Sequence, residues 1–231
     1  MKKIILFALL ALLAACSSMQ KTTPEEQFKK SFPRHQFESF DETSTKGVYE
    51  VYDGRRVYYY LPEGDVILLG SMISKDNRNL TQESMADKMA AGMKNLPLDK
   101  AVIIGSGKTQ VVEFIDPNCY YCRMAFNFFR HRKNDVTKYV FFHPLSENSA
   151  KKIRHIICSK DRAQAYEDVM SGKLDTNAEF NLCADKAADD LEQAHQQASS
   201  RARVQATPLF YIKGKVVPGF DQPALEKLLA E

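Results

Sequence analysis

The sequence predicts an α+β protein with a helix and a small antiparallel sheet in its first half, a connecting helix, and a second domain of mixed strands and helices. Two observations carry this prediction. Val- and Tyr-rich runs between residues 48 and 70 are broken by Asp53-Gly54 and Glu63-Gly64, which is typical of short strands joined by turns. From Thr109 onward the order is β-α-β, a helical block, then β-β-α.

The first residues are typical of an export signal. Two lysines precede an apolar run over residues 4–13, and Ala14-Ala15-Cys16 follows. The run is too short to cross a bilayer, which needs about 20 apolar residues. We expect residues 1–15 to be a signal peptide, because the alternative, a buried N-terminal helix, would have no evident surface to pack on.

Leu13-Ala14-Ala15-Cys16 resembles the lipobox of bacterial lipoproteins, in which the cysteine is lipidated and becomes the new N-terminus. The alternative is ordinary cleavage after Ala15, which would leave a reactive exposed thiol in an oxidising compartment. Lipidation explains Cys16 better. Ser17 resembles the outer-membrane sorting pattern, so residues 16–23 are expected to tether the chain to the outer membrane from the periplasmic side.

The charge balance argues against nucleic acid as a partner. Two of the 32 basic residues lie in residues 1–15, which leaves 30 against 29 acidic residues, a net charge of about +1. Four of the five cysteines remain besides Cys16, an even number in an exported chain, and this favours disulfide chemistry. We expect no cofactor.

A helix is expected to start at Thr23-Pro24-Glu25-Glu26. Thr23 would cap the helix, Pro24 would occupy its first turn, and a Glu side chain could accept the backbone N–H of the cap residue. It should end near Phe32, because Pro33 disfavours helix at the residue before it.

Three strands are expected next, at Val48–Tyr52, Arg56–Leu61 and Asp65–Gly70. This meander has few large aliphatic residues with which to build its own core, and its aromatic face would suit pairing with a second subunit. We therefore expect residues 24–79 to be a dimerisation domain and the protein to be a homodimer.

The segment from Thr81 to Met93 is expected to be helical, with Thr81 as its cap. Met85, Met89 and Met93 recur every fourth residue, which we interpret as a packing stripe rather than a ligand site. Residues 80–108 thus form a linker helix and a connection.

The second domain is expected over residues 109–231. Its predicted strands are Val111–Ile115, Tyr139–His143, Leu209–Lys213 and Lys215–Val217, and its predicted helices are Cys119–Arg132, one long block from Glu147 to about Arg203, and Ala224–Ala230.

The strongest motif is the Cys119-x-x-Cys122 pair. A strand and a short loop deliver Cys119 to the start of a helix, where unpaired backbone N–H groups and the helix dipole stabilise a thiolate, the species that attacks disulfides. Cys122, one turn later, can displace the resulting adduct. The alternative is half of a zinc site, but its other half would require Cys158 and Cys183, which are not paired as a knuckle.

Pro208 lies at the start of a predicted strand, where its missing N–H is tolerated and its peptide bond can be cis. One interpretation is that Pro208 is an ordinary turn residue at the start of a strand. Together with the cysteine pair, however, Ala206-Thr207-Pro208 resembles the cis-proline loop of thioredoxin folds. There Pro208 would lie against the disulfide, and the backbone of Thr207 would be free to pair with an extended substrate.

Taken together, these motifs resemble the DsbC/DsbG family of periplasmic disulfide isomerases. The likeness extends to Ile157–Asp161 and Tyr166–Lys173, which resemble the helical insertion of the family, and to Val217–Phe220. It implies a thioredoxin fold with a helical insertion for residues 109–231.

The resemblance also implies residue roles. Cys119 would be the attacking thiol, Cys122 the resolving thiol and Pro208 the cis-proline. Cys158 and Cys183 would form the structural disulfide of the family, the alternative being free buried cysteines. The dipeptide Tyr120-Tyr121 differs from the Gly-Tyr and Pro-Tyr of the two named members, and because this dipeptide tunes the redox potential, the balance of isomerase, reductase and oxidase stays open.

Glu113 lies in the apolar strand that leads to Cys119. It resembles the buried acid of some thioredoxin-fold oxidoreductases, which would exchange a proton as Cys122 reacts. The alternative is an outward-facing glutamate on an edge strand, and the sequence does not decide between them.

The function implied by the resemblance is a disulfide isomerase or reductase, with chaperone activity, that acts on misoxidised exported proteins. An inner-membrane donor similar to DsbD would keep it reduced, although a short outer-membrane tether makes that donor hard to reach. The alternatives are a DsbA-like thiol oxidase and a lipoprotein that holds or assembles clients, with incidental cysteines.

Overall fold

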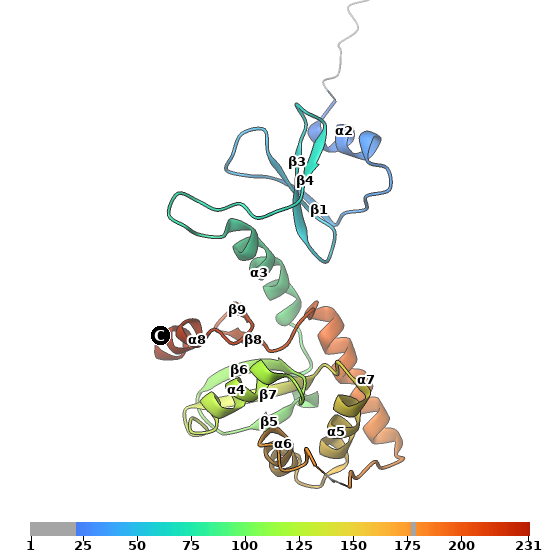
Figure 1. The fold of residues 1–231 in the computed structure, drawn as a ribbon, viewed down its shortest axis with the longest axis vertical. Helices are drawn as coiled ribbons and strands as arrows, with labels where there is room; N and C mark the ends of the chain where they lie inside the picture. The colour runs from blue at the N-terminus through green and yellow to red at the C-terminus, as the bar shows by residue number, and fades with distance from the viewer. Residues whose placement is uncertain (1–21, 177–178) are drawn as a thin grey trace, which may run out of the picture. The chain divides into compact units, whose positions relative to one another are not determined.

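The computed structural model describes residues 22–176 and 179–231 and divides into two compact units, the first ending at Gly70 and the second beginning at Ser71 (Figure 1). The expected signal peptide and Cys16 lie outside the described residues. Within the described ranges, no helix combines the length and apolar character needed to cross a membrane.

The first unit opens with helix α2 (Pro24–Ser31), which begins as predicted. The Thr23 hydroxyl accepts the Glu26 backbone N–H at 3.2 Å, and the Glu26 carboxylate accepts the Thr23 N–H at 2.9 Å. Two backbone donors at this end of the helix are thereby satisfied.

The sheet of the first unit has the order β1-β2-β3-β4, and all neighbouring strands are antiparallel. The strands are β1 (Ser39–Glu42), β2 (Tyr49–Tyr52), β3 (Val57–Leu61) and β4 (Val66–Leu68). Three of them were predicted. Strand β1 was not, because it is short and three of its four residues are polar, so no strand pattern emerges before it pairs with β2.

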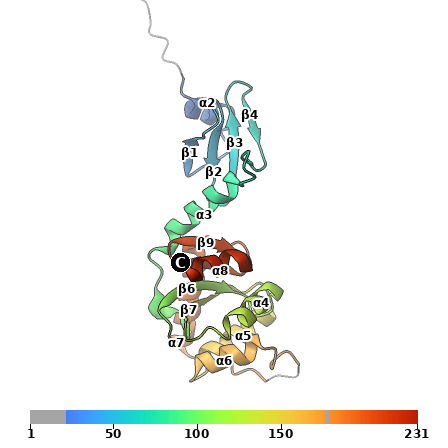
Figure 2. The same ribbon diagram turned by 90° about the vertical axis from the view of Figure 1, so that its left-hand side faces the viewer.

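Helix α2 covers the aromatic face of this sheet (Figure 2). The buried Phe28 ring lies 5.1 Å from that of Tyr60 and 5.7 Å from that of Phe40, measured between centroids. The prediction that this sheet lacks a core of its own and offers its aromatic face to a second subunit was therefore wrong: aromatic rings take the place of the missing aliphatics.

The second unit is built on a five-stranded sheet of order β5-β7-β6-β8-β9. Only β6 and β7 are parallel, and the other neighbours are antiparallel. The strands are β5 (Val102–Ile104), β6 (Thr109–Ile115), β7 (Val136–Phe142), β8 (Leu209–Ile212) and β9 (Lys215–Pro218). Strand β5 lies in the segment expected to be a connection and was not predicted.

Helix α3 (Leu80–Met93) belongs to the second unit and starts one residue earlier than predicted. Its cap is Asn79, whose side chain accepts the Gln82 N–H at 3.0 Å, and not Thr81, whose hydroxyl accepts the Met72 N–H at 2.8 Å instead. Met93 is buried against one face of the sheet, which fits the packing interpretation of the methionine stripe. A short 3₁₀ turn, η1 (Leu98–Lys100), follows.

The predicted single helical block is three helices, so that prediction was wrong. They are α5 (Glu147–Cys158), α6 (Arg162–Met170) and α7 (Lys186–Arg201), and α5 and α7 lie side by side in Figure 1. Extended backbone at Ser159 ends α5, and Asp161 and Asp185 cap the next two helices. Cap residues inside a helical pattern were the available signal for these breaks. Helices α4 (Tyr120–Phe129) and α8 (Gln222–Ala230) pack together on one face of the sheet.

Candidate active site

Cys119 is the N-cap residue of helix α4, directly after the loop that leaves strand β6. Its backbone N–H donates to the Asp116 carbonyl at 3.1 Å, and its carbonyl accepts the Arg123 N–H at 3.2 Å. The side chain is partly exposed. The sulfur thus lies at a helix N-terminus, where the first backbone N–H groups lack helical partners, and it is accessible from solvent.

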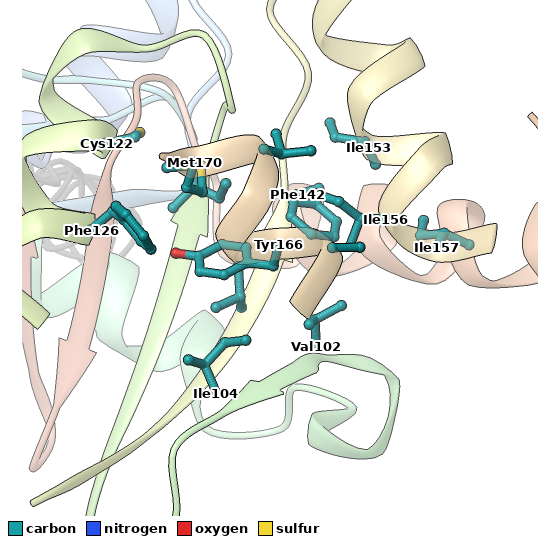
Figure 3. Close-up of a cluster of buried hydrophobic side chains, with 14 of the residues drawn as sticks. Val102, Ile104, Cys122, Phe126, Phe142, Ile153, Ile156, Ile157, Tyr166 and Met170 are labelled. Atoms are coloured by element: carbon teal, nitrogen blue, oxygen red, sulfur yellow. The ribbon is translucent and has the colours of Figure 1, made fainter. Parts of the chain in front are cut away.

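Cys122 lies one turn further along and is wholly buried, in a cluster with Phe126, Tyr166 and Met170 (Figure 3). Burial raises the pKa of the Cys122 thiol well above its ordinary value, and the nearby charges of Cys119 and Glu113 raise it further. The two cysteines are therefore unequal: one accessible at a helix end, the other protected and protonated.

Thr207 and Pro208 bring a distant segment against Cys119. The bond between them is cis, and Pro208 immediately precedes strand β8. The Cys119 Sγ lies 3.3 Å from the Thr207 carbonyl oxygen and donates to it. The Pro208 carbonyl accepts the Gly219 N–H at 2.8 Å, which joins the loop after β9 to the same site.

Glu113 is buried in strand β6, between β7 and β8, so the alternative of an outward-facing residue on an edge strand is wrong. Its Oε2 accepts the Lys138 Nζ at 2.8 Å, and the same Nζ donates to the Tyr166 hydroxyl at 3.1 Å. Lys138 is also buried, and Oε1 of Glu113 has no hydrogen-bond partner among the described residues. Glu113 is thus a paired buried carboxylate near Cys122.

The surface around Cys119 is apolar. The Tyr120 and Tyr121 side chains are 69% and 57% exposed, with ring centroids 5.4 Å apart, and Met124 on the next turn is also exposed. Exposed Leu145 is tied to the loop before Cys119, since its N–H donates to the Asp116 carboxylate at 2.7 Å. We call these four exposed side chains beside Cys119 the apolar rim: Tyr120, Tyr121, Met124 and Leu145.

Cys158 and Cys183 are joined by a disulfide, with their Cα atoms 5.7 Å apart. It links the end of α5 to the segment before α7. Sulfurs bonded to each other are not available as zinc ligands in this structure. Within residues 22–176 and 179–231, no three His, Cys, Asp or Glu side chains are grouped to hold a metal ion.

Sequence reasoning missed Lys138, Lys152, Asp116, Arg123 and Asp175. Lys138 and Lys152 had a detectable signal, because each falls at a position where its strand or helix turns an apolar face inward. Asp116, Arg123 and Asp175 had none, since their partners come from other elements.

Comparisons with known proteins agree with this geometry. Residues 14–82 match the model described as the disulfide bond isomerase protein N-terminal domain, and residues 96–231 match the thioredoxin-like domain. A probable thiol:disulfide interchange protein DsbC of Bordetella pertussis is 30% identical over 223 residues, 92% of this chain and 77% of that one. The chain belongs to the DsbC family. The DsbC of Escherichia coli K12 is 25% identical over 227 residues, 94% of this chain and 91% of that one.

One solved structure supports the fold of this DsbC family member. The thiol-disulfide exchange protein alpha-DsbA2 of Wolbachia pipientis superposes with a TM-score of 0.53 at 15% identity, covering 66% of this chain and 98% of that one. The predicted α+β class with a thioredoxin fold is confirmed, as are membership of the DsbC family and the assignment as a thiol-disulfide oxidoreductase.

Proposed function

We propose that this DsbC family member isomerises and reduces wrong disulfides in exported proteins, with Cys119 as the attacking thiol and Cys122 as the resolving thiol. The observation that carries this assignment is the contrast between the two sulfurs. Cys119 is partly exposed at a helix N-terminus beside the Thr207 carbonyl, whereas Cys122 is buried one turn away.

The reaction begins when the Cys119 thiolate attacks one sulfur of a client disulfide. A bond forms between Cys119 and that sulfur, the client bond breaks, and the departing client sulfur takes a proton. If another client thiol then attacks the mixed disulfide, Cys119 is released and no electrons are gained or lost overall. If Cys122 attacks instead, the client receives two electrons and two protons, and a Cys119–Cys122 disulfide remains.

The second outcome requires a reductant that restores the dithiol. A membrane reductase similar to DsbD fits this requirement, since the family resemblance implies such a donor. Thr207 and Pro208 would border the client chain, and the apolar rim would contact apolar segments that a misoxidised protein exposes. Such contacts also support a chaperone role.

Glu113 would accept the Cys122 proton. Burial disfavours the Cys122 thiolate, so the resolving step needs a nearby base. The Glu113 carboxylate is close enough to Cys122 for its negative charge to raise the pKa of that thiol. Lys138 would hold the Glu113 carboxylate in place through their 2.8 Å ion pair.

Trapping of clients tests the proposal directly. In a Cys122→Ala variant the mixed disulfide has no resolving thiol inside the enzyme, so client proteins should accumulate on Cys119 in intact cells. Gel mobility without reductant, followed by mass spectrometry, identifies them. A Cys119→Ala variant should trap none, and equal trapping by both variants would contradict the assignment of roles.

Export and anchoring belong to the same proposal. Residues 1–15 would direct the chain to the periplasm, and lipid on Cys16 would hold it at the outer membrane. The export pattern and lipobox support this. Metabolic labelling with a radioactive fatty acid should mark the parent chain but not a Cys16→Ser variant.

The protein would act as a homodimer through its N-terminal domain, residues 24–79. Strand β4 supports this assembly, because it ends the sheet and exposes Val66 and Leu68, with exposed Leu69 directly after it. An apolar strand at a sheet edge is a template for pairing with a second copy.

A further inference from the structure

The loop that carries Cys119 is held by charged side chains from other elements. Asp116 shapes the loop from within, since its carboxylate accepts the Asn118 N–H at 2.7 Å. The Arg123 Nε donates to the Pro117 carbonyl at 3.0 Å, and the Lys152 Nζ donates to the Asn118 side-chain oxygen at 2.7 Å. The two residues immediately before Cys119 are thus each fixed by one cation.

Both cations share one carboxylate. The Asp175 Oδ1 accepts the Lys152 Nζ at 2.5 Å and an Arg123 guanidinium nitrogen at 2.7 Å, and Oδ2 accepts the other guanidinium nitrogen. Asp175 lies after α6, in the helical insertion, and belongs to no helix or strand. A residue far from the cysteine pair in sequence therefore connects α4, α5 and the loop before Cys119.

The burial of Lys152 makes the Asp175 carboxylate hard to replace. The Lys152 side chain is 4% exposed, and a buried ammonium group without a counter-charge is strongly unfavourable. The hydrogen bond from Arg123 holds the pKa of Asp175 well below its usual range, so Asp175 is charged wherever the protein works. The Asp175–Arg123 pair is bidentate, which fixes orientation as well as charge.

We propose that Asp175 is a positioning residue for the attacking thiol. By fixing Lys152 and Arg123 it holds Pro117 and Asn118, and this keeps Cys119 at the N-cap of α4 with its sulfur beside the Thr207 carbonyl. The helical insertion therefore takes part in the reaction through Asp175 and its partner Lys152. This inference rests on the proposed role of Cys119.

The test separates positioning from stability with three variants in a Cys122→Ala background: Asp175→Ala, Lys152→Met and the two combined. The rate constant of the Cys119 thiolate with a disulfide-bonded peptide is measured on its high-pH plateau, and stability by denaturant titration. All three variants should react about tenfold more slowly or worse, because small misplacements of reacting groups are costly.

Stability should follow a different order. Asp175→Ala leaves a buried cation unpaired and should be the least stable variant, whereas adding Lys152→Met removes that cation and should restore stability. The rate should stay low in the double variant. If the rate recovers together with stability, Asp175 has only a structural role and the inference is overturned.

Asp168→Ala is the matched control. Asp168 lies in the same insertion and pairs with exposed Lys173, away from the Cys119 loop, so its loss should leave the rate at the parent value. Parent-like rates in Asp175→Ala and Lys152→Met would overturn the positioning role and leave the proposed function intact. A parent chain whose Cys119 does not react at all would overturn both.

Discussion

Two thiols three residues apart have opposite surroundings. Cys119 is partly open to solvent at the start of α4, whereas Cys122 is enclosed by apolar side chains, with the Glu113–Lys138 pair in the same interior. The first sulfur thus lies at a helix N-terminus, whereas burial in the interior raises the pKa of the second. In the proposed reaction, attack and resolution are therefore divided between two residues with different surroundings.

Glu113→Gln should lower the maximal rate of the Cys122 step, because the proton acceptor is lost, and should move the pH midpoint of that step to lower pH. The carboxylate raises the pKa of Cys122, and the amide removes that negative charge while leaving the positive Lys138 in place. The measurement is the rate of internal resolution of a pre-formed mixed disulfide against pH. Glu113→Gln combined with Lys138→Met should return the profile toward that of the parent, and an unchanged profile in Glu113→Gln would remove Glu113 from the mechanism.

The sequence indicated these residues unequally. The cysteine pair and Pro208 have local signals: spacing, a helix start, a strand start. Glu113 was recognised as a candidate, but its partner Lys138 depends on the parallel register of β6 and β7, which no local pattern specifies. Asp175 is the extreme case, since only the folded insertion brings it to Arg123 and Lys152.

At the scale of elements, the sequence predicts those with strong local signals, whereas two short strands without such signals were missed. The Thr23–Glu26 capping box and the Asp53-Gly54 turn each determine a boundary by neighbouring residues alone. Strands β1 and β5 have four and three residues, so each becomes a strand only by pairing with a neighbouring strand. Both misses therefore have the same cause: tertiary pairing that a short window cannot contain.

The packing of α2 on its sheet is testable with one substitution. Phe28→Ala should cost about 3–5 kcal/mol, because it empties a position that several aromatic rings surround. Chemical denaturation followed by tyrosine fluorescence reports it directly, since the chain has no tryptophan. Phe32→Ala, at a partly buried position on the same cluster, should cost less. Equal losses would show that Phe28 is not the centre of this core.

At the scale of the whole molecule, the oligomeric state decides how many cysteine pairs one enzyme particle carries. The aromatic face is covered by α2, so among residues 22–70 the large apolar side chains left exposed for a second copy lie at the β4 edge. A dimer built there would carry two cysteine pairs.

Leu68→Lys should convert the dimer to a monomer. The Leu68 side chain is 46% exposed, so a lysine is accommodated in the monomer but opposes an apolar interface. Light scattering after gel filtration measures the mass, and reduction of a small disulfide should continue at the parent rate. A parent chain that is monomeric at every concentration would contradict the assembly, and Ile103→Lys, at an exposed position of the other unit, is the control for added charge.

The burial of Cys122 also sets a timescale. Once a client is attached to Cys119, resolution by the enzyme requires that the buried Cys122 thiol first lose its proton, which burial disfavours. During that delay another thiol of the client can attack the mixed disulfide. A long dwell time favours rearrangement within the client over its release in reduced form, so we expect the depth at which one sulfur is buried to decide how often a captured protein is reshuffled before it escapes.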